Sequence, residues 1–535
     1  MAASRTTVFR GNSDLGQYRM KPMQTLHTAI HSCAYLYMAA TFFSGFVASA
    51  DEPISTTESQ AAHIDTFQGK PRVFVLTDIG NEPDDQMSLT RFLLYSNDFD
   101  VEGLVAVTST WQRKKVSPEI IQKVLSNYGK IRSNLLKHAD GFPTLEDLSH
   151  VVRPGQPAYG MAAVGKDQMS PGAQLLIEAV DRKDPRPLYV TIWGGANTLA
   201  EALLQVRDKR SPEEVKAFVS QMRVYSISDQ DDAGPWIRGE FRDLFYIVSP
   251  STEDGAQYSS ATWTGISGDK YYRNAPGADF TTVSNKWLDE HVRNKGFLGE
   301  TYPQYLFIME GDTPTFLGLI NNGLASYRNP GWGGWGGRYI VRQPSGEPRP
   351  IWTQGGDSYP GSPNSRDTVI GVDGKGYTSD QATIWRWRKA FQHDFSARMD
   401  WTLKEFKDAN HNPVAVVNGD SGKEPLVINA KVGTPVTLSA AGTTDPDGNK
   451  VKYTWWYYEE AASAICKPVK PEDVIGERGE DELSVQPTVK IENSEGEEAK
   501  VIPQSAGTAH VILTVEDDGE PSLTAYRRVI LTIEN

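Results

Sequence analysis

The chain has 535 residues, with 68 acidic and 54 basic side chains and a formal net charge of −14. Such an acidic surface is poorly suited to nucleic acid or to anionic lipid, so bulk charge argues against both as partners. The length allows a large core plus a second domain. Its two cysteines, Cys33 and Cys466, are too few for a disulfide-stabilised scaffold.

The N-terminal residues predict an export signal. A short apolar core runs from Ala34 to Phe43, and Ala48-Ser49-Ala50 offers a small-residue cleavage site. We therefore expect residues 1–50 to be a signal peptide and the protein to be secreted or periplasmic. The apolar core is too short for a membrane span, and we expect no membrane association. Removal of Cys33 with the signal would leave Cys466 alone, without an internal disulfide.

An acid-rich turn follows the first strong strand. Val73–Leu76 predicts a buried parallel strand, and the apolar residues from Met87 onwards predict a helix. The turn between them carries four carboxylates, which repel one another unless protons or a hard cation compensate: Asp78, Glu82, Asp84 and Asp85. Oxygen-only ligands favour calcium or magnesium over zinc. The alternative is a helix N-terminus decorated with acids, which the helix dipole stabilises.

Strands and helices alternate from residue 71 to about residue 401. Polar clusters recur at the ends of the expected strands, including Asp231 and Asp232 after one strand and Asp312 after a later one. This pattern predicts an α/β domain with a mostly parallel open sheet, flanked by helices, and one ligand crevice at the carboxyl ends of its strands. The further expected strands are Val101–Val107, Leu188–Trp193, Val224–Ile227 and Tyr305–Met309.

The composition changes near Asn412. Beyond it, alternating apolar and polar residues predict an all-β, Ig-like sandwich, with strands over Thr434–Ser439, Val451–Tyr458, His510–Val515 and Arg528–Ile533. We expect a linker over residues 51–70, an α/β domain over 71–412 and the sandwich over 413–535.

A second strong signal is the glycine-rich segment Asn329–Tyr339, which contains Trp332, Trp335 and Arg338. Glycines cannot fill a core, so the segment predicts an exposed loop that presents flat aromatic faces to sugar rings. The alternative is a loop that packs its tryptophans against the body of the protein.

The acid-rich turn resembles the signature of the inosine–uridine-preferring nucleoside hydrolases, Asp-Thr-Asp-Pro-Gly-x-Asp-Asp. Asp78, Asp84 and Asp85 match its first and last two acids, and Gly80 replaces the middle one. Trp193–Leu199 is similar to the family's Gly-x-Leu-Thr-Asn segment, and Gly311-Asp312 to its late His-Asp pair. The chain more closely resembles the secreted nucleoside-hydrolase-like group often labelled cellulose-binding, which also carries a C-terminal Ig-like module.

The resemblance implies a role for each matching residue. Calcium binds a water and lowers its pKa, and Asp78 accepts the proton of that water. Asp84 holds a sugar diol, with Glu82 and Asn197 as further substrate contacts. The implied calcium ligands are Asp78, Asp85, the carbonyl of Ala196 and Asp312.

A glycosidic oxygen also needs a proton donor, and the candidates are Asp231, Asp232 and then Glu82. We expect a secreted, calcium-dependent hydrolase that acts on a glycosidic or N-glycosidic bond of a saccharide. The alternative is a non-catalytic carbohydrate-binding protein, which Gly311 in place of the family's His supports.

Overall fold

The computed structural model describes residues 57–162, 164–165, 169–252, 255–268, 277–356, 363–462 and 488–535. The expected signal peptide and both cysteines lie outside these residues. Residues 53–535 form one compact unit, so the expected boundary between residues 412 and 413 stays a prediction. None of the helices in the described part of the chain is both long and apolar enough to cross a membrane.

The core of the α/β part is an eight-stranded sheet. All neighbouring strands run parallel except β7, which pairs antiparallel with β8 at one edge. In sheet order the strands are β3 (Val152–Pro154), β2 (Asp100–Ala106), β1 (Arg72–Thr77), β4 (Leu188–Ile192), β5 (Met222–Ser228), β6 (Phe245–Ser249), β8 (Ile351–Thr353) and β7 (Ile340–Arg342). The expected α/β class is confirmed.

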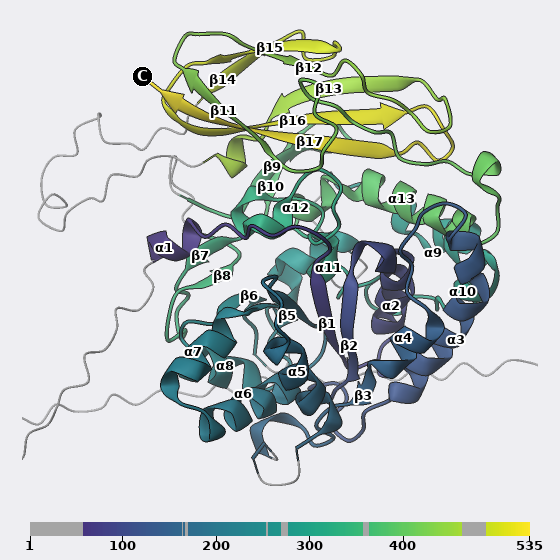
Figure 1. Ribbon diagram of the computed structural model, residues 1–535, viewed down its shortest axis with the longest axis vertical. Helices are drawn as coiled ribbons and strands as arrows, with labels where there is room; N and C mark the ends of the chain where they lie inside the picture. The colour runs from purple at the N-terminus through teal and green to yellow at the C-terminus, as the bar shows by residue number, and fades with distance from the viewer. Residues whose placement is uncertain are drawn as a thin grey trace, which may run out of the picture. The chain divides into compact units, whose positions relative to one another are not determined.

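Helices cover both faces of the sheet. Successive side chains from Val73 to Leu76 in β1 point to opposite sides, and those on both sides are apolar and must be buried. Val73 and Val75 pack into the core with α2 (Asp84–Leu94), α3 (Pro118–Leu135) and α13 (Arg388–Trp401). Phe74 and Leu76 pack on the other face, which the helices at the lower left of Figure 1 cover. Those helices are α5 (Pro171–Asp181), α6 (Asn197–Lys209), α7 (Pro212–Ser220) and α8 (Ala233–Glu240).

The strand order reverses beside β1. The chain passes from β1 to β2 and β3 on one side, and β4 then returns to the other side of β1. In open α/β sheets such a reversal leaves a crevice outside the carboxyl ends of the strands. The acid-rich turn after β1 and the glycine turn after β4 both lie at this point.

The strand expected over Tyr305–Met309 is wrong, because this segment has no regular secondary structure. Leu306 is 64 % exposed, whereas a central strand would bury its apolar side chains. The sheet position beyond β6 is occupied instead by β8, through the pair Ile247 and Trp352.

The remaining helices and strands of this part are short: α1 (Thr57–Ala61), α4 (Leu145–His150), α9 (Asn285–Leu288), α10 (Gly296–Gly299), α11 (Pro314–Leu317), α12 (Ala382–Trp385), β9 (Asp367–Ile370) and β10 (Gly376–Ser379).

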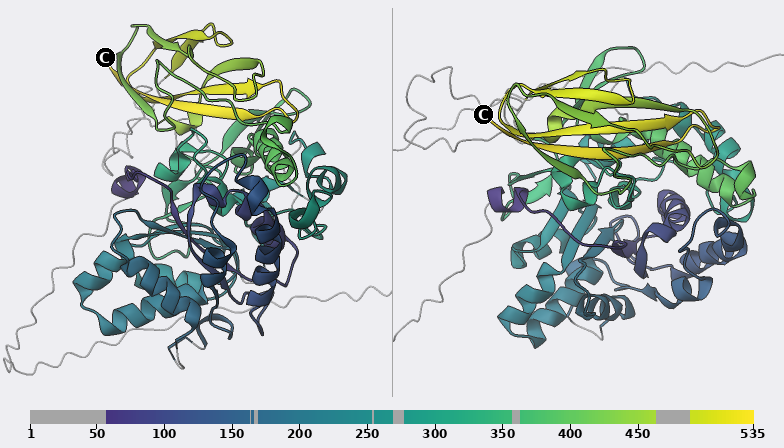
Figure 2. Two further views of the ribbon diagram at one scale, coloured as in Figure 1. Left: turned by 45° about the vertical axis from the view of Figure 1, so that its right-hand side comes forward. Right: turned by 45° about the horizontal axis from the view of Figure 1, so that its top comes forward.

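The C-terminal part is all-β, as expected. Its described strands form a four-stranded and a three-stranded sheet, seen from two further directions in Figure 2. A separate apolar core, which includes Leu438, Trp455 and Leu531, lies between them. The strands are β11 (Leu426–Lys431), β17 (Thr524–Glu534), β16 (Gly507–Asp517) and β13 (Val451–Tyr457) in one sheet, and β12 (Val436–Ser439), β15 (Glu498–Pro503) and β14 (Val489–Glu492) in the other.

The four-stranded sheet also contributes to the core of the α/β part. Ile512 and Tyr526 belong to the same apolar cluster as β1 and α2. The Arg528 side chain donates hydrogen bonds to the carbonyl oxygens of Leu324, at 2.7 Å, and Gly333, at 2.8 Å. A Cβ atom on Gly323 would lie 1.8 Å from the carbonyl oxygen of Tyr526, so only glycine allows this approach.

Candidate metal centre

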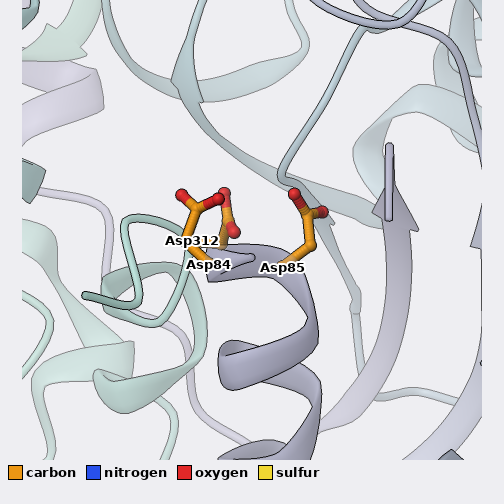
Figure 3. A group of neighbouring side chains, drawn as sticks. All are labelled: Asp84, Asp85 and Asp312. Carbon is orange, nitrogen blue, oxygen red and sulfur yellow. The ribbon is translucent and has the colours of Figure 1, made fainter. Parts of the chain in front are cut away.

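Four buried aspartates meet at the carboxyl end of the sheet. Asp78 directly follows β1, Asp84 and Asp85 open α2, and Asp312 lies just before α11. Oxygens of Asp84, Asp85 and Asp312 all lie within 4.8 Å of one another. Figure 3 shows these three carboxylates at the N-terminal end of α2, projecting to the same side. The turn after β1 is therefore more than an acidic helix terminus, because a distant part of the chain adds a further acid.

Burial makes the negative charge of these groups costly. It is the main cause that raises the pKa of Asp84, Asp85 and Asp312 well above the usual range of a carboxyl. Repulsion among the neighbouring acids raises these pKa values further. The pKa of Asp78 rises to about 6, again mainly by burial, against the lowering effect of the hydrogen bond from Ser109. The cluster can therefore hold protons near neutral pH or exchange them for a cation.

Asp78 is held by short contacts on two sides. The Ser109 hydroxyl, which follows β2, donates to Asp78 Oδ2 at 2.5 Å. A Cβ atom on Gly194 would lie 2.8 Å from Asp78 Oδ1, so the glycine turn after β4 packs directly against the carboxylate. The Thr77 hydroxyl donates to Asp85 Oδ1. Asp78 and Asp85 thus have fixed orientations.

Unpaired buried oxygens test whether this site fits a cation. Among the described residues, Asp312 Oδ2, Asn197 Oδ1 and Gln112 Oε1 are buried and accept no hydrogen bond. The Asn197 orientation follows from its Nδ2, which donates to the carbonyl oxygen of Ala158 at 2.7 Å. Buried oxygens without partners are rare, and hard cations such as calcium and magnesium bind oxygen donors. The unpaired Oδ2 of Asp312, grouped with the carboxylates of Asp84 and Asp85, therefore fits such an ion.

The turns after β4 and β5 carry the next three expected site residues, Ala196 after β4 and Asp231 and Asp232 after β5. Asp231 Oδ2 accepts from the amide of Asn197 and Oδ1 from the amide of Ala233, both at 3.0 Å, which caps the N-termini of α6 and α8. Burial raises the Asp231 pKa to about 7. Asp232 is exposed and accepts from the Met161 amide at 2.8 Å. The Ala196 carbonyl accepts from the Ala200 amide, so its role as a metal ligand stays a prediction.

Glu82 and Gly311 border the cluster. Glu82 is half-buried, and its charge contributes to the raised pKa of Asp84. A Cβ atom on Gly311 would lie 3.0 Å from Asp84 Oδ2 and 3.1 Å from the ring of Trp263. Gly311 therefore packs closely against the Asp84 carboxylate and the Trp263 indole, and a side chain at this position would be crowded. The Trp263 ring is itself fixed by a hydrogen bond from Nε1 to Ser228 Oγ.

The exposed aromatic loop expected around Trp335 is wrong. Trp335 is 1 % exposed, and its ring contacts Phe391 and Tyr526. Arg338 is buried too, and its guanidinium is paired with Asp367. Trp332 is half-buried, with its ring against His510.

The glycines of this loop allow the C-terminal sheet to approach closely. A Cβ atom on Gly333 would lie 2.2 Å from the hydroxyl of Tyr458. The alternative considered from the sequence, a loop packed against the body of the protein, is therefore the correct one. Its buried side chains cannot stack on a sugar.

Sequence reasoning missed the residues that follow β2. Ser109 bonds Asp78, and the Gln112 side chain donates to the backbone carbonyl of Asp78 at 2.8 Å. The available signal was their position, directly after an expected parallel strand at the carboxyl end of the sheet. Short polar side chains in a loop are too common for that signal to single them out.

The parallel sheet and the buried acids after β1 define a nucleoside-hydrolase-like protein. The family model described as "Cellulose-binding Sde182, nucleoside hydrolase-like domain" matches residues 72–339. A second, "Cellulose-binding protein Sde0182, C-terminal domain", matches residues 435–533. The chain belongs to this nucleoside-hydrolase-like, cellulose-binding family, which confirms the resemblance found in the sequence.

Among solved structures, the chain is similar to a nucleoside hydrolase-related protein from Saccharophagus degradans "that is associated with carbohydrate metabolism". The two are 35% identical, with a TM-score of 0.70, and the match covers 87% of this chain and 100% of that one. The effector protein XOO4466 is 14% identical over 54% of this chain and 88% of its own, and its TM-score of 0.26 is too low to bear on function. A search of curated proteins found no match.

Proposed function

We propose that this protein is an exported hydrolase that cleaves a glycosidic or N-glycosidic bond of a saccharide with the help of calcium. The observation that carries the proposal is the cluster of Asp78, Asp84, Asp85 and Asp312, four buried acids at the reversal of the sheet. A site that merely stacked on sugars would have no use for this costly buried charge. The carbohydrate-related names of the family and of the similar structure support a saccharide as substrate.

The residues around the cluster are assigned to cation binding, to proton transfer or to substrate contact. Asp85 and Asp312, with Asp78 and the Ala196 carbonyl, would hold calcium, which when bound lowers the pKa of water and polarises it. Asp78 accepts a proton from the attacking water, since its pKa of about 6 suits a general base near neutral pH. Asp84, whose Oδ2 lies beside Gly311, accepts hydrogen bonds from a sugar diol. Asn197 is a further candidate for substrate contact through its unpaired Oδ1.

For the proton donor we favour Glu82 over Asp231 and Asp232. Both Asp231 oxygens already accept backbone hydrogen bonds, and Asp232 bonds the Met161 amide at the surface. Glu82 is half-buried at the edge of the cluster, where it can meet both solvent and substrate.

Calorimetric titration of calcium into chelator-treated protein, followed by a screen of glycosides and nucleosides, tests this function. We expect Asp85→Asn to lose both calcium binding and hydrolysis. Asp208→Asn is the matched control, because Asp208 is 63 % exposed and outside the cluster. Unchanged hydrolysis in Asp85→Asn on every responsive substrate would refute the proposal.

The second candidate is a carbohydrate-binding protein without catalysis. The family description and Gly311, at the position of the nucleoside hydrolases' His, favour it. The titration separates the two functions: saccharide binding with neither calcium binding nor turnover would make this second candidate the better one.

A further inference from the structure

Trp111 differs from every other tryptophan of the protein. All 13 tryptophans of the chain lie within the described residues, and Trp111, at 43 %, is the one that is exposed. It lies in the loop that follows β2, at the same end of the sheet as the aspartates. A single exposed apolar side chain is normal on a protein surface and needs no function. The surroundings of Trp111 set it apart.

The backbone of Trp111 is fixed to the proposed general base. The Ser109 hydroxyl that donates to Asp78 Oδ2 also accepts from the amides of Trp111, at 3.0 Å, and Gln112, at 3.1 Å. The Gln112 side chain donates to the carbonyl oxygens of Asp78, at 2.8 Å, and Ile79, at 3.3 Å. Ser109 and Gln112 are buried. The exposed indole is therefore carried on a rigid loop, two hydrogen bonds away from the carboxylate of Asp78.

A row of aromatic rings leads from Trp111 into the site. The ring centroids of Trp111 and Tyr258 are 6.4 Å apart, and those of Tyr258 and Trp263 are 5.2 Å apart, both with edge-on packing. Trp263 in turn packs against Gly311, next to Asp84. A Cβ atom on Gly255 would lie 3.3 Å from the Trp111 ring, so this glycine lets the chain pack against the indole.

We propose that Trp111 forms a second sugar-binding subsite, which takes the unit of an oligosaccharide next to the unit held by Asp84. This inference rests on the proposed function, and it makes the substrate class an oligosaccharide instead of a nucleoside or a simple glycoside. The flat face of an indole matches the apolar C–H face of a pyranose ring, and a rigidly held indole loses little entropy on binding. Trp111 therefore takes the role that the buried Trp335 cannot fill.

Iodide quenching of tryptophan fluorescence tests the subsite, since iodide reaches exposed indoles. The probes are glucose, cellobiose and cellohexaose, added to the full chain in the Asp78→Asn background so that no substrate is consumed. We expect cellohexaose to protect Trp111 from iodide and glucose to leave it accessible. Trp111→Ala should weaken cellohexaose binding about tenfold or more, and Trp111→Phe should restore most of it. Phe297→Ala, which removes a 49 % exposed ring elsewhere, is the matched control.

Equal affinity of Trp111→Ala and its parent for cellohexaose would overturn the subsite, as would the absence of cellohexaose binding by the parent. Either result leaves the proposed hydrolase standing, because calcium binding and hydrolysis are measured separately. Conversely, if cellohexaose protects Trp111 but the protein with Asp78 intact hydrolyses no substrate, the subsite stands and the hydrolase is refuted.

Discussion

Arg91 and Glu310 form a fully buried, two-pronged ion pair that joins the two halves of the aspartate cluster. Arg91 lies on α2, the helix that begins with Asp84 and Asp85, and Glu310 stands just before Gly311 and Asp312. Arg91 Nε and Nη2 donate to the two Glu310 oxygens at 2.5 and 3.1 Å. Glu310 also has a left-handed backbone, with φ of 59°, which is strained for a residue with a side chain. This pair therefore fixes where Asp312 lies.

Glu310→Gln should lower the free energy of unfolding by about 3–5 kcal/mol, because it leaves the buried Arg91 charge uncompensated. It should also weaken calcium binding, since Asp312 loses its anchor. Urea unfolding and calorimetry measure the two effects. Asp181→Asn is the control: it breaks an exposed pair with Arg210, and its cost should stay below about 1 kcal/mol. Equal costs for both variants would contradict the anchoring role.

Gly195→Ala should destabilise the protein and disturb the cap of α6. The new Cβ atom would lie 2.5 Å from Asp231 Oδ2 and 2.6 Å from the Thr108 carbonyl oxygen. Gly239→Ala is the control, because a Cβ atom there meets no atom within 4 Å and Gly239 lies inside α8. That control should be neutral or stabilising by up to about 1 kcal/mol. Thermal unfolding of both variants and of the parent measures these effects. Equal melting temperatures for Gly195→Ala and Gly239→Ala would contradict the prediction.

The calcium-free protein should lose stability as the pH rises from about 4 to about 6, through the titration of Asp78. Its pKa is raised from 3.8 to about 6 in the folded state, so the folded protein holds a proton that the unfolded chain releases. That contribution is complete below the unfolded pKa and is lost above the folded one. Calcium competes with protons, so its stabilising effect should grow over the same range.

Urea unfolding with a chelator and with calcium, at several pH values, measures this dependence. Asp78→Asn should flatten the fall in the chelator series, while Asp208→Asn should keep it. Each unit by which the folded-state pKa is raised changes the free energy of unfolding by about 1.4 kcal/mol over this pH range. A chelator series that rises or stays level between these pH values would contradict the cost of the buried charge.

Trp335→Ala should cost about 3–5 kcal/mol of stability, because it empties a buried indole site between Phe391 and Tyr526. Trp111→Ala should change stability by less than about 0.5 kcal/mol, because its ring is exposed. Denaturant unfolding of both variants compares the two tryptophans directly. Similar costs for the two variants would contradict a difference in burial between Trp335 and Trp111.

The acid-rich turn could be predicted from the sequence because its signals are local. A β-type apolar run, a cluster of acids and a helical pattern follow one another between Val73 and Leu94, and each element lies where expected. The position of Asp312 beside Asp85 is not local, and it came from the resemblance to a family. The network of Ser109 and Gln112 gave no distinctive pattern at all.

The glycine-rich loop around Trp335 shows why the remaining errors arose. Composition described the loop correctly as rich in glycine and in aromatic side chains. It could not reveal that Tyr458 and Tyr526, more than a hundred positions away in the chain, cover it. The segment Tyr305–Met309 failed in the same way, because β8 occupies the sheet position that an apolar strand would need.

The hydrogen bonds of Arg528 limit how this protein can be divided or recombined. Carbohydrate-binding modules that are joined to an enzyme only by a linker can be exchanged between enzymes, since separation exposes no new surface on either part. Here the last strand supplies partners for the carbonyls of Leu324 and Gly333 and a ring for the core around Trp335. Cutting the chain between these parts would expose apolar surface and orphan polar groups on both pieces. The α/β part and the C-terminal part should therefore unfold in a single transition and be retained together in related proteins.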